Sequence, residues 1–290
     1  MKTHMKLTRR LTLILTVALG LALPARGGVI LDDTWGDGTR SDQKPPTKSA
    51  WYSSKGSLLT ATANSMTLSV STGSVMVITY FTTNDASPVR LNVGDKLTAS
   101  FTLTLNKVAA ENKSTGFRLG LFDFGDSKNS PKRVSADKFS TSSQGFGVTG
   151  YALFQNMGAT FHKSAPMDIR KRTNLSYTLM STSDDWTSLG TGPGTTDAFP
   201  GFAEGTPYVL QFAVQRTGTN SVAIDATWSN TVNGATMTTS VTDGVATNSS
   251  FDGIALRPSG MSSTASKIIF HEVKIELTPA PAPPVASKRP

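Results

Sequence analysis

Aromatic, amide and guanidinium side chains recur on one face of two segments in the middle of the chain. Residues 117–122 and 145–155 both alternate with the period of two that is typical of β-strands. One row of each segment is apolar and suits the core of a sheet. The opposite row carries Arg118, Phe122, Phe154 and Asn156. The sequence therefore predicts two central strands whose second face is available for binding.

This second face has the chemistry of a sugar-binding surface. An aromatic ring covers the apolar side of a pyranose, and planar amide or guanidinium groups bond its hydroxyls. A further strand predicted over 208–216 directs two glutamines away from its apolar row. The expected ligand-binding residues are Arg118, Phe122, Tyr151, Phe154, Asn156, Gln211 and Gln215. The alternative is that the aromatic rings form a second layer of packing.

Catalytic chemistry has less support in the sequence. A glycoside hydrolase needs two carboxylates that face each other across the sugar, and the chain has no Glu-x-Asp-x-(x)-Glu string. Asp123 and Asp126 form the one acidic pair at a predicted strand end that could serve. A polysaccharide lyase could use Arg118 and Tyr151. We assign no catalytic residue, and lyase or hydrolase activity remains an alternative.

Three carboxylates lie close together near the start of the mature chain. Asp32, Asp33 and Asp37 fall in a Gly-rich, turn-forming stretch around Trp35. Carboxylate oxygens are the ligands that calcium prefers. The spacing therefore makes these three residues candidate ligands of a structural calcium ion. The alternative is a solvated loop held in place by Trp35.

The leader accounts for most of the positive charge. The chain has 290 residues, 28 of them basic and 20 acidic, for a formal net charge of +8. Residues 1–27 hold five of the basic residues and no acidic one, and an apolar run from Leu11 to Leu23 is of the length of a signal-peptide core. The remaining excess of three basic residues gives no clustered patch for nucleic acid. We expect an exported protein, secreted or retained in the periplasm or cell envelope.

The rest of the chain predicts a single β domain over 28–277. Residues 97–105 alternate apolar side chains with serine and threonine, which is the pattern of a half-buried strand. Similar strands recur about every ten residues, and Asn233-Gly234 predicts a two-residue hairpin turn. Cysteine is absent, which excludes disulfides and thiolate metal sites. Residues 278–290 are proline-rich and predict an extended tail without a membrane anchor.

The order of these strands resembles the concanavalin A-like jelly rolls, which include laminin-G-like and lectin-like domains. The likeness lies in the long loops around Asp126 to Ser143 and Asp184 to Gly205, and in the closing pair FDGIALRPSG and KIIFHEVKIEL. The opening stretch from Asp33 to Tyr52 also resembles exported bacterial proteins of this type. The resemblance implies an antiparallel β-sandwich with a concave, glycan-binding sheet and, in several families, a calcium ion.

These observations together predict a secreted carbohydrate-binding or surface-interaction module without catalysis. The expected partner is a polysaccharide or a cell-surface glycan. Asn248-Ser249-Ser250 also matches the acceptor pattern for N-glycosylation, which carries little weight in a chain of bacterial type. A purely structural envelope protein, whose groove would be filled by its own side chains, is the remaining alternative.

Overall fold

Two large antiparallel sheets form the body of the protein. The computed structural model describes residues 27–70, 73–83, 87–112, 115–125, 133–141, 143–145, 147–161, 165–175, 178–180, 185–192, 199–260 and 264–281. The predicted leader, apart from Gly27, and the predicted tail beyond Pro281 lie outside the described residues. The domain boundaries at 28 and 277 therefore stay predictions.

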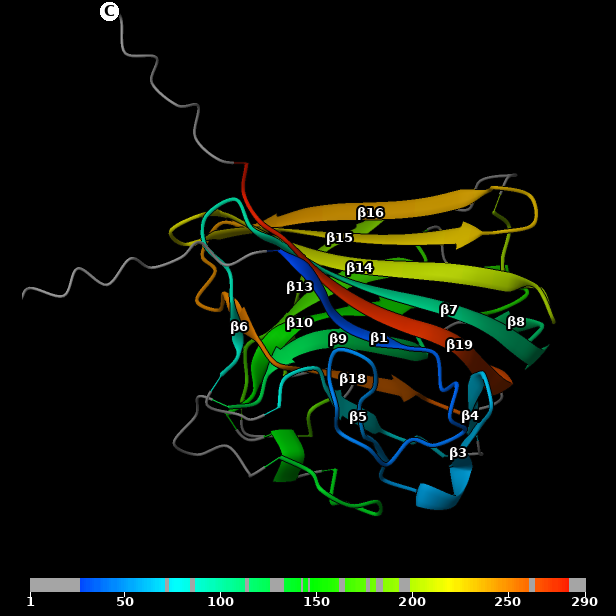
Figure 1. Ribbon diagram of the computed structural model, residues 1–290. Helices are drawn as coiled ribbons and strands as arrows, with labels where there is room; N and C mark the ends of the chain where they lie inside the picture. The colour runs from blue at the N-terminus through cyan, green and yellow to red at the C-terminus, as the bar shows by residue number, and fades with distance from the viewer. Residues whose placement is uncertain are drawn as a thin grey trace, which may run out of the picture.

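The first sheet has eight strands, and its long members form the upper layer in Figure 1. Seven of them follow the spatial order β16-β15-β14-β7-β19-β4-β3, and β1 also pairs with β19. The bounds in that order are Thr236–Asp243, Ser221–Asn230, Pro207–Gly218, Lys96–Val108, Ala265–Thr278, Ser65–Ser69 and Leu59–Thr62, with β1 at Gly28–Asp33.

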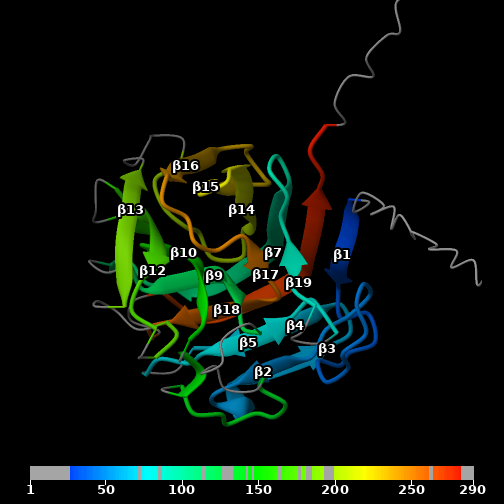
Figure 2. The same ribbon diagram turned by 90° about the vertical axis from the view of Figure 1, so that its left-hand side faces the viewer.

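The second sheet has seven strands in the order β13-β12-β10-β9-β18-β5-β2. Their bounds are Trp186–Gly192, Met167–Arg172, Thr149–Gln155, Phe117–Asp123, Gly253–Pro258, Val77–Tyr80 and Trp51–Ser53. Two short pairs complete the strands, β8 (Glu111–Asn112) with β11 (Thr160–Phe161) and β6 (Val89–Arg90) with β17 (Ser250–Phe251). Two 3-10 turns lie at Gly56–Leu58 and Ser143–Gly145. Figure 2 shows both sheets around a common interior.

The alternation of apolar residues builds the core between the sheets. In β7, Leu97, Ala99, Phe101, Leu103 and Leu105 are all buried, and they pack against the inner rows of β14, β19 and the second sheet. This row faces inward because successive side chains of a strand point to opposite faces. The predicted all-β class and the antiparallel sandwich are confirmed.

The central strands β9 and β10 pair as the sequence predicts, with Phe154 opposite Arg118. All seven residues of β9 are buried, however, so neither of its faces meets solvent. A second hydrophobic cluster, which we call the outer core, lies on the face of this sheet that points away from the first sheet. It contains Met76, Ile78, Tyr80, Phe122, Phe124, Val134, Val148, Ala152, Phe154, Leu179, Met180, Trp186 and Ala255.

Candidate functional site

The side chains predicted to bind a ligand do lie on one face of β9 and β10, but other parts of the chain cover this face. Arg118 lies over the ring of Phe154, with 5.0 Å between its guanidinium carbon and the ring centroid. Arg118, Phe122 and Phe154 are only 4%, 0% and 1% exposed. Burial lowers the pKa of Arg118 to about 10, so its guanidinium remains charged at neutral pH. The expectation that this row faces solvent is wrong.

Two loop segments cover the row. Val134 comes from the segment after β9, and Leu179 and Met180 come from the segment after β12. The backbone oxygen of Met180 accepts a 2.7 Å hydrogen bond from Nη1 of Arg118, and the same oxygen accepts a second bond from Arg257. Apolar loop residues therefore fill the hollow, and the carbonyl of Met180 accepts one bond from each of these two guanidinium groups, while Nε of Arg118 stays buried without a partner. This arrangement fits the alternative in which the aromatic rings form a second layer of packing.

Tyr151 and Asn156 are also buried. Tyr151 lies on the opposite face of β10, in the core between the sheets, where its hydroxyl donates a 2.9 Å hydrogen bond to Oδ2 of Asp243. Burial raises the pKa of Tyr151, and the neighbouring Asp243 carboxylate raises it further. Arg118 and Tyr151 therefore do not share a surface on which a substrate could meet both.

Gln211 and Gln215 belong to the other sheet. They lie on the outer face of β14, away from the inward row of Leu210, Phe212 and Val214. Gln211 is exposed, and Nε2 of Gln215 donates a 3.2 Å hydrogen bond to the backbone oxygen of Gly94. The structure therefore distributes the predicted ligand-binding residues over separate places and does not bring them into one site.

The three candidate calcium ligands do not converge either. Asp33 is buried, and its carboxylate accepts hydrogen bonds from the backbone of Trp35 and Ser49 and from the indole of Trp51. Burial raises the pKa of Asp33 despite these bonds. Asp37 accepts a 2.6 Å bond from Nζ of Lys48, which lowers its pKa to about 2. Asp32 is the neighbour of Asp33 along β1, so its side chain points to the other face of the strand.

Among the residues that the structure describes, no three acidic or histidine side chains gather closely enough to hold a metal ion. The Asp33 carboxylate accepts hydrogen bonds from the backbone at Trp35 and Ser49 and so holds these two segments together. Calcium binding at Asp32, Asp33 and Asp37 stays a prediction, and their geometry gives it no support.

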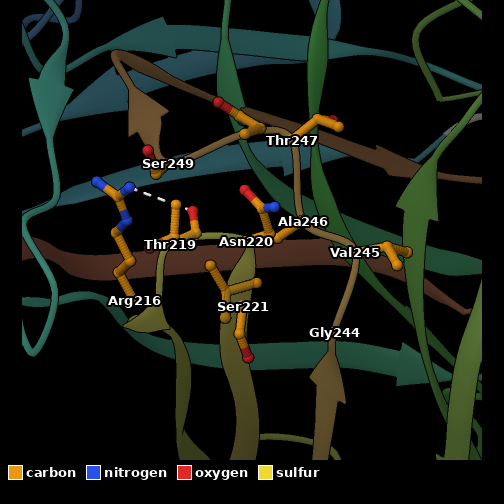
Figure 3. Close-up of a pocket in the computed structure, with 11 residues that line it drawn as sticks. Arg216, Thr219, Asn220, Ser221, Gly244, Val245, Ala246, Thr247 and Ser249 are labelled. Atoms are coloured by element: carbon orange, nitrogen blue, oxygen red, sulfur yellow. Dashed lines mark hydrogen bonds between the residues drawn. The ribbon is translucent and has the colours of Figure 1, made fainter.

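A polar cavity of about 570 Å³ lies instead at one end of the sandwich. The β14–β15 turn forms one wall and the loop after β16 forms the other, as Figure 3 shows. Ala246 N donates a 2.8 Å hydrogen bond to the backbone oxygen of Asn220, which ties the loop to the turn. The lining residues are Arg216, Thr219, Asn220, Ser221, Val222, Gly244, Val245, Ala246, Thr247, Asn248 and Ser249. We call this space the end cavity.

Arg216 holds the turn in place. Its Nε, Nη1 and Nη2 donate to the backbone oxygens of Gly218, Leu91 and Thr219 at 3.2, 2.9 and 3.2 Å. Figure 3 shows the bond to Thr219. Because all three nitrogens donate to backbone oxygens, Arg216 fixes the position of the turn that forms one wall of the end cavity. Hydroxyl and amide groups then provide most of the polar chemistry of the end cavity.

Asn248 lies between the end cavity and a neighbouring cavity of about 400 Å³ and lines both. The residue is 9% exposed, and its Oδ1 accepts a 3.1 Å hydrogen bond from the backbone N–H of Ser250. Its Nδ2 is buried and has no hydrogen-bond partner. A buried donor without a partner costs about 1–3 kcal/mol. A turn of this side chain that brought Nδ2 to an acceptor of a ligand in either cavity would relieve that cost.

The neighbouring cavity adds a carboxylate and a second guanidinium. Asp123, at the end of β9, accepts hydrogen bonds from the backbone of Gly125 and the hydroxyl of Ser250. Arg90, at the end of β6, is exposed at the same cavity. Asp123 was predicted as part of an acidic pair, but its predicted partner Asp126 lies outside the described residues.

Sequence reasoning missed the end cavity. The loop that builds it, from Gly244 to Ser249, has no periodic pattern, and its only recognisable motif is the Asn-Ser-Ser string that begins at Asn248. Its density of threonine, serine and asparagine was the available signal. That composition is typical of any polar loop, so only the fold reveals that it faces the β14–β15 turn.

No protein-family model and no curated protein matches the chain. Among solved structures, the chain is similar to peanut lectin, with 10% identity over 88% of this chain and 98% of the lectin, at a TM-score of 0.46. An endo-1,3-beta-glucanase from Streptomyces sioyaensis has 12% identity over 90% and 99%, with a TM-score of 0.46. The exoplasmic/lumenal domain of VIP36, in a form with bound Ca2+ and Man3GlcNAc, has 14% identity over 83% and 87%, also at 0.46.

The antiparallel sandwich agrees with the fold that the sequence resemblance implies. The fold itself rests on the sheet order and the two-sided burial described above. With identities of 14% or less and TM-scores below 0.5, the similarities carry no argument about ligand or activity. Within the described part of the chain, no helix has the length and apolar character needed to span a membrane.

Proposed function

We propose that the protein is an exported carbohydrate-binding or surface-interaction module that works without catalysis, and that its ligand is a polysaccharide or cell-surface glycan. The binding site in this proposal is the end cavity together with the neighbouring cavity. The observation that carries it is the buried, unpartnered Nδ2 of Asn248 between the two spaces.

The lining suits a ligand rich in hydroxyl groups. Hydroxyls of Thr219, Ser221, Thr247 and Ser249 can both donate and accept, as sugar hydroxyls do. Asn220 and Asn248 add planar amides, and Asp123 is a carboxylate acceptor in the neighbouring cavity. A site of this composition favours recognition through many neutral hydrogen bonds.

Binding without catalysis is supported by the acidic groups at the site. Glycoside hydrolysis needs two opposed carboxylates, and Asp123 is the one carboxylate among the described residues that line the two cavities. Its oxygens already accept bonds from Gly125 and Ser250. A lyase based on Arg118 and Tyr151 lacks support because the two lie on opposite faces of the same sheet.

A glycan array probed with the protein tests the proposal. We expect binding to at least one polysaccharide, and a loss of roughly tenfold or more in affinity for Asn248→Ala, because a ligand bond to Nδ2 would relieve a cost of about 1.4 kcal/mol or more. Gln211→Ala, on the outer face of the other sheet, is the matched control and should bind as the wild type does. Equal binding by both variants would place the site elsewhere.

A structural envelope protein is the second candidate function. The specific observation in its favour is the outer core, which fills the face that the sequence predicted to be open. This candidate predicts no binding to any glycan on the array. The same experiment therefore separates the two.

A further inference from the structure

We propose a second sugar-binding site at the edge strand β2, where Tyr52 offers its ring to an uncharged pyranose. A cavity of about 480 Å³ lies there between the loop before β2 and the segment that follows Arg133. Its lining residues include Arg40, Ser41, Trp51, Tyr52, Ser135 and Asp137. This site is independent of the end cavity and adds to the proposed function.

Tyr52 is where the covered face of the second sheet reaches solvent. β2 is the last strand of the second sheet among the described residues and pairs with β5, with Tyr52 opposite Ile78. Trp51 and Ser53 are buried, while Tyr52, between them, points to the other face and is partly exposed. Its ring packs against the outer core on one side. A ring supported in this way is rigid, which keeps the entropic cost of stacking a ligand on it small.

The phenol of Tyr52 remains neutral over the pH range in which the protein would act. Partial burial raises the pKa of Tyr52, and the nearby Asp137 carboxylate raises it further. The hydroxyl can therefore donate to a sugar oxygen as well as accept from a sugar hydroxyl. Tyr52 thus combines an apolar face with a polar tip, which is the combination that a pyranose requires.

Arg40 and Asp137 form the polar side of the cavity. Arg40 donates to Asp137 through Nη1 at 3.2 Å and Nη2 at 2.7 Å, and the same guanidinium donates to the backbone oxygens of Leu59, Trp51 and Gly56. Its donors are engaged, so Arg40 is a positioning residue. It fixes a carboxylate whose side chain is 31% exposed.

Asp137 is the group that would contact the ligand. Its oxygens accept bonds from Arg40 and from the backbone of Ser53, which leaves part of their acceptor capacity for a ligand. Partial burial raises the pKa of Asp137, but the bonds from Arg40 and Ser53 outweigh it, so the pKa stays below its ordinary value. An ionised acceptor favours sugar hydroxyls and disfavours acidic sugars.

The two sites share no lining residue and are built from different strands and loops. In Figure 2, β2 lies at the bottom, whereas β15 and β16, whose connections build the end cavity, lie at the top. One protein molecule could therefore hold two glycan chains, or two distant parts of one chain. Binding at two sites would raise the apparent affinity for a polymer above that for a short oligosaccharide.

The test titrates the protein with neutral hexasaccharides (cellohexaose, laminarihexaose and mannohexaose) and follows assigned amide resonances by NMR. We expect at least one of them to shift the signals of Tyr52 and Asp137, and Tyr52→Ala to weaken that binding about tenfold, as loss of a stacking ring implies. Tyr52→Phe keeps the ring and should lose less. A hexamer of galacturonate is the charged comparison and should not shift these signals.

The variants separate this proposal from the first one. Asn248→Ala should leave the shifts at Tyr52 unchanged, and Tyr52→Ala should leave binding at the end cavity unchanged. The proposal is overturned if no neutral hexasaccharide shifts Tyr52 or Asp137, or if the shifts disappear in Asn248→Ala and persist in Tyr52→Ala. Because chemical shifts in the wild type report the site directly, the test also holds if Tyr52→Ala fails to fold.

Discussion

Replacing Phe154 by alanine distinguishes a second core from a ligand surface. Phe154 is 1% exposed, and its ring packs edge-on against Trp186 with the centroids 5.3 Å apart. Two guanidinium groups lie over the same ring, those of Arg118 at 5.0 Å and Arg170 at 4.5 Å. All of these contacts disappear in the variant.

The expected loss of stability is large. Truncating a buried phenylalanine to alanine typically costs about 3–5 kcal/mol, because transfer energy is lost and a cavity remains. Each partly buried cation–π contact adds about 0.5–2 kcal/mol. We therefore expect Phe154→Ala to lower the free energy of unfolding by about 4–5 kcal/mol, the upper half of the range for truncation. This is a large share of the total stability of about 5–15 kcal/mol that is usual for a domain.

Urea unfolding followed by tryptophan fluorescence measures this effect. The midpoint should fall while the slope of free energy against urea concentration stays constant, because the folded state keeps its extent. Gln211→Ala is the control, since its side chain is exposed and such substitutions usually change stability by less than about 0.5 kcal/mol. A loss below about 1 kcal/mol for Phe154→Ala would refute the outer core, since a solvent-facing ring contributes little to folding.

The remaining predictions concern backbone packing and pH. Gly120→Ala should destabilise the protein by about 1–3 kcal/mol in the same urea assay, because a Cβ there would lie 2.5 Å from the backbone oxygen of Tyr151; unchanged stability would contradict the register of β9 and β10. Burial raises the pKa of Asp252 from 3.8 to about 6 even though Arg133 bonds to it. The folded state therefore holds this proton more tightly, and the stability that the group contributes is full below about pH 4 and is lost as pH rises through 6. Asp252→Asn should remove that decline. The urea midpoint of the variant should therefore rise relative to that of the wild type as the pH is raised from 4 to 7. The reverse trend would contradict the raised pKa of Asp252.

The regular strands could be predicted from sequence because each carries its own signal. The row from Leu97 to Leu105 has one possible inward face, and the structure buries all of it. Asn233-Gly234 predicts a two-residue hairpin turn, and the structure has a hairpin between β15 and β16 at this place, but the connection runs over residues 231–235. Gly234 has a positive φ of 73° whereas Asn233 does not, so the predicted turn type is wrong. Local pattern and tertiary structure agree in the strands, so no long-range information was needed.

The covered face could not be predicted in the same way. A row that contains arginine and phenylalanine predicts a solvated or ligand-binding face, since arginine is seldom fully buried. Its burial depends on the carbonyl of Met180, 62 positions after Arg118, and on loop residues such as Val134. The segment around Val134 looks polar along the chain, whereas residues 175–180 (LSYTLM) alternate apolar and polar side chains. Neither pattern shows that the segment folds back over the sheet.

Burial on both faces of the second sheet determines where a ligand can bind. The first sheet covers one face, and loops cover the other over its central strands β9 and β10. Polar groups with spare hydrogen-bonding capacity then remain where this packing ends, at the edge strand with Tyr52 and Asp137 and at the strand ends around Asn248. Apolar packing in the hollow stabilises the fold, and the two binding sites that we propose lie at its rim. Substitutions in the outer core should therefore change stability, and substitutions at the rim should change binding.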